Sequence, residues 1–284
     1  LDLGWEISRT INAGLDFGFL NNKLNGYIEF YNTKTSDLLM KRAIPTFTGF
    51  NEIWQNIGKT QNKGFEFNLN YAPVRTKDLN IDFTFNASRN WEKILELISG
   101  EDLPNNKWFI GEPLSVLYNY EKLGVWQYGE EEDAAKYNAS VGDLKIKDQD
   151  GDGTISAVKD RVILGQERPK WIASLGANIQ YKNFDFSFNI NSRWGYSFNL
   201  APFNDVVLDG QRWLPAVDYW TPDNPTNNYP KADQSNGWDT YRSANGYQKG
   251  DHIKLQDVTV GYSFDKLLSK TFIKKARFYV QLRN

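Results

Sequence analysis

Three aspartates at alternate positions form the most recognisable chemical motif of this chain. Asp148, Asp150 and Asp152 are followed directly by Gly153. Carboxylates at positions 1, 3 and 5 with glycine at position 6 are the first half of a calcium-binding loop, where the glycine permits a sharp turn and position 7 offers a backbone carbonyl. Position 7 is Thr154. The spacing therefore predicts a structural Ca²⁺ or Mg²⁺ site.

The second half of the motif departs from this pattern. Position 12, where a bidentate glutamate is expected, is Lys159, and an acid follows one position later at Asp160. A one-residue insertion would bring Asp160 to the ion. The predicted ligands are then Asp148, Asp150, Asp152, Thr154 and Asp160. The alternative is an Asp/Gly-rich turn held by local hydrogen bonds. In either case the expected role is structural, because a cation would rigidify a loop whose carboxylates repel one another.

Residues that carry out nucleophilic or metal catalysis are scarce. The chain has no cysteine and one histidine, His252, which excludes Cys–His pairs and metal sites with two histidines. No serine lies in a G-x-S-x-G context. His252 is therefore expected to be a surface imidazole, and the run from Glu130 to Glu132 to be a solvated acidic face rather than a glycosidase pair. We expect no enzyme activity, and an outer-membrane hydrolase remains the weakest alternative.

Aromatic residues account for 15% of the chain, and several tryptophans lie in or beside its long polar connections. These are Trp126, Trp213, Trp220 and Trp238. Exposed aromatic rings there could stack on sugars or contact a partner protein, whereas buried ones would pack the connections against each other. The sequence leaves both interpretations open.

Composition narrows the class of protein. The chain has 284 residues, 40% of them hydrophobic, with a mean hydropathy of −0.60 and no apolar run long enough for a transmembrane helix. The net charge of −2 and the absence of a basic run in the sequence argue against nucleic-acid binding. Because the sequence begins at Leu1 without a signal peptide, we expect a mature chain or an internal fragment.

Eight stretches alternate apolar and polar residues, which is the pattern of β-strands with one apolar face. They lie near residues 11–19, 24–30, 65–71, 81–87, 171–181, 184–190, 258–264 and 276–282. Their apolar positions carry no charge, and charges such as Asp16, Glu29 and Glu66 fall on the opposite face. Strands of about 9–11 residues with this pattern are typical of outer-membrane β-barrels.

The connections between these stretches alternate in length. Short ones are expected near 20–23, 72–78, 182–183 and 265–275, and long ones near 37–61, 90–170 and 196–251. Outer-membrane barrels have short periplasmic turns and long extracellular loops, whereas the loops of a soluble β-sandwich need not be asymmetric. Helix is expected only at 130–135 and 91–98.

At these motifs the chain resembles the C-terminal barrel region of the SusC/RagA family of TonB-dependent outer-membrane transporters. The similar segments, in chain order, are residues 12–24, 31–39, 56–58, 62–66, 142–145, 160–165, 219–225 and 254–262. Two features depart from the family pattern. The aspartate loop has one extra residue before Asp160, and His252 replaces the usual aromatic entry to the strand that follows it.

The resemblance implies an all-β fold in which residues 1–284 supply about eight long antiparallel strands of a transmembrane barrel of about 22 strands. It implies uptake of oligosaccharides or peptides across a bacterial outer membrane, with a SusD-like surface lipoprotein and the TonB complex as partners. TonB would act through an N-terminal plug, which we expect to be absent from this sequence, as are the first half of the barrel and its last strand.

Besides the hydrolase, two alternatives to the transporter remain at this point: a self-contained outer-membrane barrel that binds a surface partner, and a soluble, calcium-stabilised glycan-binding β-domain. Unpaired strand edges in lipid are costly, because each free backbone group lacks a hydrogen-bond partner there. The transporter interpretation therefore predicts that the strand near Ile11 does not pair with the strand near Phe278.

Overall fold

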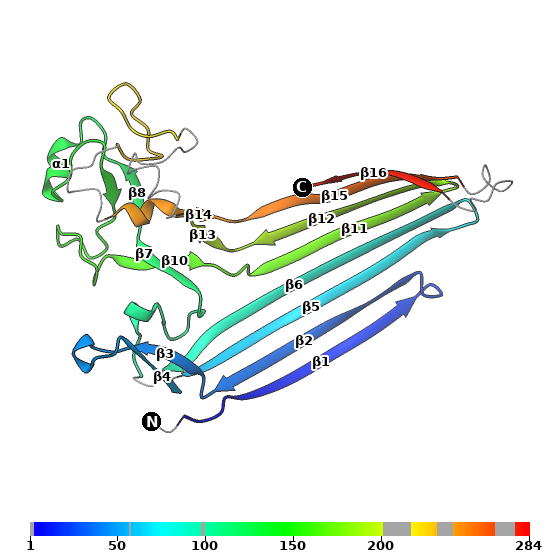
Figure 1. Ribbon diagram of the computed structural model, residues 1–284, viewed down its shortest axis with the longest axis horizontal. Coiled ribbons are helices and arrows are strands. Elements are labelled where there is room, and N and C mark those ends of the chain that lie inside the picture. Colours follow the sequence, from blue (N-terminus) through cyan, green and yellow to red (C-terminus); the bar gives the residue numbers. More distant parts are fainter. Residues whose placement is uncertain (1–2, 57, 98–99, 201–216, 232–240, 265–275) are drawn as a thin grey trace. The chain divides into compact units, whose positions relative to one another are not determined.

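The computed structural model describes residues 3–56, 58–97, 100–200, 217–231, 241–264 and 276–284. The chain divides into two compact units (Figure 1), which we describe separately. The sheet unit comprises residues 1–114, 169–195 and 251–284, and the loop unit comprises residues 115–168 and 196–250.

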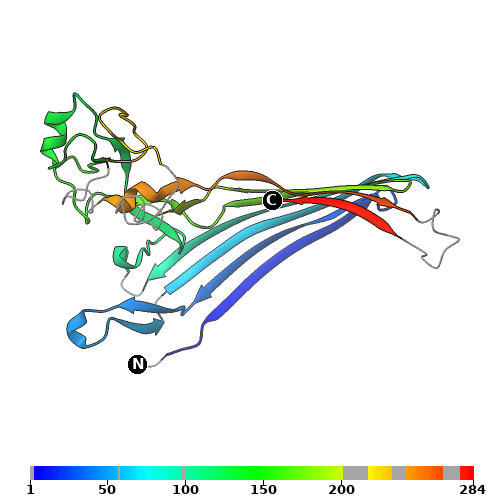
Figure 2. The same ribbon diagram turned by 45° about the horizontal axis from the view of Figure 1, so that its top comes forward.

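The sheet unit is built on one eight-stranded antiparallel sheet, whose strands lie side by side in Figures 1 and 2. The strands, in their order across the sheet, are β1 (Ile7–Phe19), β2 (Leu24–Ser36), β5 (Gly58–Arg75), β6 (Leu79–Leu97), β11 (Trp171–Tyr181), β12 (Phe184–Trp194), β15 (His252–Ser263) and β16 (Arg277–Arg283). The all-β antiparallel fold and the eight predicted strands are confirmed.

The predicted apolar residues of neighbouring strands are paired with one another across the whole sheet. One row takes a residue from every strand: Phe19, Leu24, Tyr71, Phe83, Ala177, Phe188, Val258 and Leu282. Because side chains alternate between the two faces of a strand, this register places the alternating apolar residues of the eight strands on one face, which we call the apolar face.

The opposite, polar face carries a network of amides and hydroxyls between neighbouring strands. Asn68 donates to Asn86 at 2.7 Å, and Asn86 donates in turn to Ser174 on the next strand at 3.3 Å. At the β12–β16 side, Arg277 pairs with Asp185 through two N–H groups. Most strand charges lie on this face, as predicted.

Several charges share the register of the apolar face, all outside the positions considered in the sequence: Arg9, Lys34, Lys63, Arg89 and Lys93. Arg89 stands between Phe65 and Trp171 in the register of that face. Its guanidinium lies over the rings of Trp91 and Trp171, with centroid distances of 4.3 and 4.7 Å. The two aromatic faces therefore shelter this cation, which sits toward the end of the sheet where the long connections leave it.

Some predicted boundaries are wrong. The helix expected at 91–98 is instead the last part of β6, because Trp91 to Leu97 continue to pair with β5 as far as Gly58. The first long connection therefore ends earlier than predicted and spans 37–57, and the second begins later and spans 98–170. The third spans 195–251, one residue more than predicted. The short connection predicted at 72–78 shrinks to 76–78. Those at 20–23 and 182–183 are confirmed, and 265–275 lies outside the described residues.

The first long connection folds as a hairpin within the sheet unit, in which β3 (Leu39–Ala43) pairs with β4 (Glu52–Asn56) around the short helix η1 (Thr46–Thr48). A second short helix, η2 (Pro104–Asn106), follows β6. Among the described residues β1 pairs only with β2 and β16 only with β15, so the sheet is open, with those strands at its two edges.

The loop unit contains three short antiparallel strand pairs. These are β7 (Val116–Tyr120) with β10 (Arg161–Gln166), β8 (Lys122–Val125) with β9 (Leu144–Ile146), and β13 (Ser197–Asn199) with β14 (Tyr247–Lys249). The predicted helix at 130–135 is confirmed as α1 (Glu131–Lys136), and η3 (Arg242–Gly246) precedes β14. No helix in the described ranges is both long and apolar enough to cross a membrane.

The loop unit has a small core of its own. Tyr120, Leu144, Ile146 and Ala244 are buried together, and Ile155 and Tyr241 pack against them. Tyr120 and Tyr241 meet edge to face, with ring centroids 5.1 Å apart. The predicted irregular loops are thus replaced by a packed unit with internal strands.

Candidate functional site

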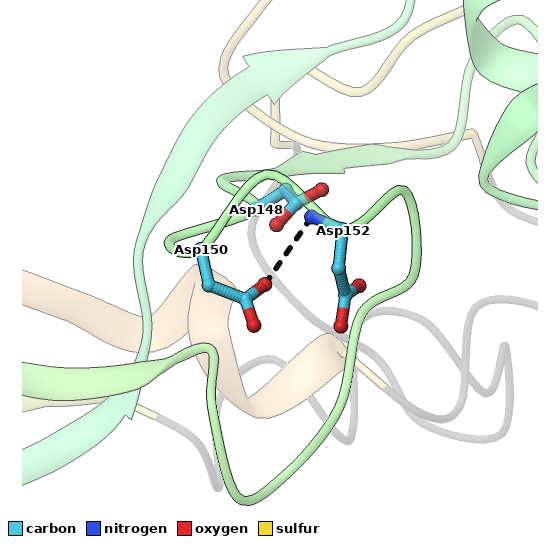
Figure 3. A group of neighbouring side chains, drawn as sticks. All are labelled: Asp148, Asp150 and Asp152. Carbon is cyan, nitrogen blue, oxygen red and sulfur yellow. Dashed lines mark hydrogen bonds between the residues drawn. The ribbon is translucent and has the colours of Figure 1, made fainter.

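The aspartate loop lies between β9 and β10 and brings three predicted ligands together (Figure 3). Carboxylate oxygens of Asp148, Asp150 and Asp152 all lie within 4.8 Å of one another. Asp148 accepts the backbone N–H groups of Gly151 and Gly153, at 2.7 and 2.9 Å. These bonds lower the pKa of Asp148. Gly153 has φ +82°, the left-handed conformation that the predicted sharp turn requires.

Lys159 supplies a cation to this cluster from position 12 of the motif. Its ammonium lies 3.0 Å from Asp150 and 2.5 Å from Asp152. The hydrogen bond from Lys159, followed by those from Thr154, lowers the pKa of Asp152 to about 2. A divalent ion bound by these aspartates would therefore have to displace the Lys159 ammonium from two of them.

Asp160 does not belong to the carboxylate group. Its side chain is fully buried, and its two oxygens accept backbone N–H groups of Gln149 at 2.8 Å and Ser156 at 2.6 Å. Asp160 thus ties together the two ends of the aspartate loop. The hydroxyl and N–H of Thr154 both donate to Asp152.

The donor set fits a divalent cation in part. Three carboxylates converge as Ca²⁺ requires, but the position that normally supplies two further oxygens supplies an ammonium instead. Both a metal site and a hydrogen-bonded turn use the same three aspartates, and the bound ion stays a prediction.

The tryptophans of the loop unit that the structure describes are buried and packed, and they are not exposed to solvent. Trp126 is 5% exposed, stacks on Tyr137 at 6.2 Å and lies under the ammonium of Lys145. Trp220 is 6% exposed, contacts Tyr128 and donates through its indole N–H to Gln127. Trp213 and Trp238 lie outside the described residues. For Trp126 and Trp220 the packing interpretation is the correct one.

The residues considered for catalysis take ordinary places. His252 is the exposed first residue of β15. Glu130 precedes α1, pairs with Lys145 at 2.7 Å and accepts the N–H of Gln127. These two bonds, that from Lys145 first, lower the pKa of Glu130. Nothing in these contacts sets up a proton-transfer pair.

Comparison with known proteins gives consistent matches along the whole chain. Residues 1–284 match the family described as TonB dependent receptor-like, beta-barrel. A TonB-dependent receptor of Formosa agariphila is 33% identical over 297 residues, covering 98% of this chain and 30% of that protein. The TonB-dependent receptor SusC of Bacteroides thetaiotaomicron is 31% identical over 301 residues, covering 100% of this chain and 29% of SusC.

A solved structure of the RagAB peptide transporter has the same fold. The TM-score is 0.74 at 23% sequence identity, and the match covers 99% of this chain and 31% of that one. This chain therefore spans only about a third of the length of the proteins it matches.

Proposed function

Because this chain belongs to the TonB-dependent receptor-like β-barrel family, we propose that it forms a wall section of an outer-membrane importer. The SusC/RagA resemblance noted in the sequence is confirmed by the similarity to SusC and by the fold shared with RagAB. The imported molecules are oligosaccharides or peptides, and a SusD-like lipoprotein and the TonB complex are the partners. The protein is a transporter and not an enzyme.

The observation that carries this proposal is the continuous apolar face of the sheet. Large apolar side chains on it are widely exposed, for example Leu15 at 63% and Phe30 at 54%. Water-soluble proteins rarely expose such a contiguous surface, whereas a bilayer stabilises it. The soluble glycan-binding alternative is disfavoured for this reason.

The open edges of the sheet favour a wall section over a self-contained barrel. In lipid the free backbone groups of β1 and β16 need partners, because no water is there to bind them. The two strands do not pair with each other in the described residues. In the proposal, further strands of a larger barrel complete both edges, and the polar face lines the lumen.

Site-directed spin labelling tests the bilayer placement. The chain has no cysteine, so a cysteine placed at Leu175 or at Asn178 labels one known site in this region. These residues lie on opposite faces of β11. In the full-length receptor reconstituted in vesicles, we expect the label at 175 to collide with oxygen dissolved in lipid and the label at 178 with a water-soluble nickel chelate. Equal contact of both labels with the nickel chelate would contradict the proposal.

Uptake measurements test the activity. Cells that carry the full-length receptor should accumulate one class of labelled oligosaccharide or peptide, and loss of either TonB or the receptor should abolish that accumulation. Uptake that persists without TonB would overturn the importer proposal while leaving the bilayer placement intact.

A further inference from the structure

The loop unit contains a cavity of about 580 Å³ that the sequence analysis did not anticipate. Segments distant in the chain form it, namely the start of β8, η3, β14 and the stretch 218–229. Its polar lining includes Lys122, Asp218, Asn228, Asn245, Gln248 and Lys249. The rings of Tyr229 and Tyr247 also line it.

Lys122 is a half-buried ammonium with neutral partners. It donates to the backbone carbonyl of Asn228 at 2.6 Å and to the side-chain oxygen of Asn245 at 2.5 Å. An ammonium has three N–H groups, so these two bonds leave one for another acceptor. Burial lowers the pKa of Lys122 to about 8, and no carboxylate of the described residues opposes this effect. In its protonated form Lys122 carries a positive charge that has no ionic partner among the described contacts.

The acids that line the cavity are engaged with other groups. Glu121 accepts hydrogen bonds from Lys147 at 3.0 Å and from Gln149 at 2.9 Å. Asp218 accepts three hydrogen bonds from the side chains of Asn224, Thr226 and Asn228, which lower its pKa. Neither acid forms an ion pair with Lys122 among the described contacts, so the counter-charge has to come from elsewhere.

Asn245 provides a second, independent sign of an absent ligand. Its side chain is 8% exposed, and its amide nitrogen has no hydrogen-bond partner in the part of the chain that the structure describes. The amide cannot rotate to improve this, because its oxygen holds the Lys122 ammonium and rotation would place N–H against N–H. A buried donor without an acceptor is unfavourable, so an acceptor beside Asn245 and Lys122 would stabilise both.

We propose that this cavity binds a carboxylate group of the imported molecule, with Lys122 as its ionic partner and Asn245 as a hydrogen-bond donor. A carboxylate offers only acceptors and one negative charge, which is what these two groups lack. Because Glu121 and Asp218 also line this cavity, a ligand with a higher negative charge is disfavoured. This inference rests on the proposed importer function and narrows its substrates to those with a sugar acid or a peptide carboxylate.

Calorimetry on the full-length receptor tests the site with matched probes. The probes are a trisaccharide with a single uronate residue and its methyl ester, and a C-terminally amidated tetrapeptide with one glutamate and the same amidated peptide with glutamine. We expect at least one acidic probe to bind tenfold or more tightly than its neutral partner. The acidic probe that binds identifies the source of the carboxylate, either a sugar acid or a peptide. Equal binding of every acidic and neutral pair would overturn the proposal.

Two variants locate the binding at this cavity. Lys122→Gln removes the charge, and Asn245→Asp gives Lys122 an internal counter-ion without removing it, so that one variant remains informative if the other folds poorly. Both should reduce the preference for the acidic probe at least tenfold. Lys249→Gln is the matched control, since it removes an exposed lysine of the same cavity, and it should leave the preference within about twofold.

The outcomes separate this inference from the importer proposal. A preference for acidic probes that survives both variants, or that Lys249→Gln reduces equally, would place the carboxylate elsewhere and overturn the inference. TonB-dependent uptake, measured on the same variants, would still stand in that case. Uptake that is independent of TonB would contradict the importer proposal whatever the calorimetry gives.

Discussion

The two units of this chain differ in where their apolar side chains lie: they are exposed on one face of the sheet unit and buried in the loop unit. In the sheet unit Leu15 is 63% exposed and Phe278 is 72% exposed, although both lie within regular strands. In the loop unit Leu144 and Ile146 are 5% and 6% exposed. The loop unit is organised as a water-soluble domain, with apolar residues inside, and the sheet has no such interior along its apolar face. One sequence therefore contains structures suited to two solvents.

The largest effect is expected from a substitution that removes a buried side chain from the core of the loop unit. Leu144→Ala should lower the free energy of unfolding of that unit by about 2–5 kcal/mol, because the surrounding side chains cannot fill the space. Leu123→Ala is the control, since Leu123 is 55% exposed on the neighbouring strand β8. Hydrogen exchange resolved by peptide should show lost protection in the loop unit only, including the segment around Ala244 that packs against Leu144. An equal loss in β5 and β6 would mean that the two units do not respond separately.

A charge on the apolar face should be next in size. Leu175→Arg is expected to destabilise the receptor in lipid vesicles by about 2–4 kcal/mol, because the guanidinium would enter the hydrocarbon layer. Asn178→Arg, on the polar face of the same strand and beside Asp82, should be tolerated. Urea unfolding in vesicles measures both. If the two arginines have the same effect, the assignment of the faces is wrong.

A smaller effect is expected from a buried acid of the loop unit. Asp160→Asn keeps the shape of the side chain but turns one of its two oxygens into a donor that faces a backbone N–H. The expected loss is about 1–3 kcal/mol, because a buried donor is left without an acceptor. Amide exchange at Gln149 and Ser156 should accelerate. Unchanged exchange at both amides would show that Asp160 does not hold the loop ends.

Substitution of Lys159 is expected to change the structure least. Its effect should be on the affinity for Ca²⁺. Lys159→Glu removes the competing ammonium and restores the bidentate acid of the calcium motif, so Ca²⁺ affinity should rise at least about tenfold. Lys159→Gln removes the ammonium without adding a ligand and should give an intermediate affinity. Calorimetry with CaCl₂ measures all three proteins. If the Lys159→Glu variant binds Ca²⁺ no more tightly than the unchanged protein, the three aspartates form a turn and not an ion site.

The sheet was predictable because its signal is local. Alternation over about ten residues assigns each side chain to a face, and charges such as Glu66 and Asp82 mark the polar one. The extension of β6 through Trp91–Leu97 was missed, since it depends on pairing with Gly58–Lys63 rather than on its own apolar period. The aspartate cluster was predictable for the same local reason.

The loop unit was less predictable because its contacts are non-local. Strands of three residues, such as β9, are too short to show a period. Lys122 reaches Asn228 and Asn245 across 106 and 123 residues of sequence, and no spacing rule joins them. The position of Asp160 also required the structure, since its partners are backbone groups that carry no sequence signal.

Gly64, which belongs to one of the segments shared with the SusC/RagA family, has a role that reaches beyond its own strand. Tyr31 on β2 lies across it and donates to Asn90 on β6 at 3.0 Å, and a Cβ at residue 64 would clash with the Tyr31 hydroxyl. The three residues are direct neighbours in the register, so sliding any of the three strands separates them. Strand stagger and strand number together set the diameter of a β-barrel. By fixing the stagger of three neighbouring strands, Gly64 would help to set the width of any barrel that contains this sheet.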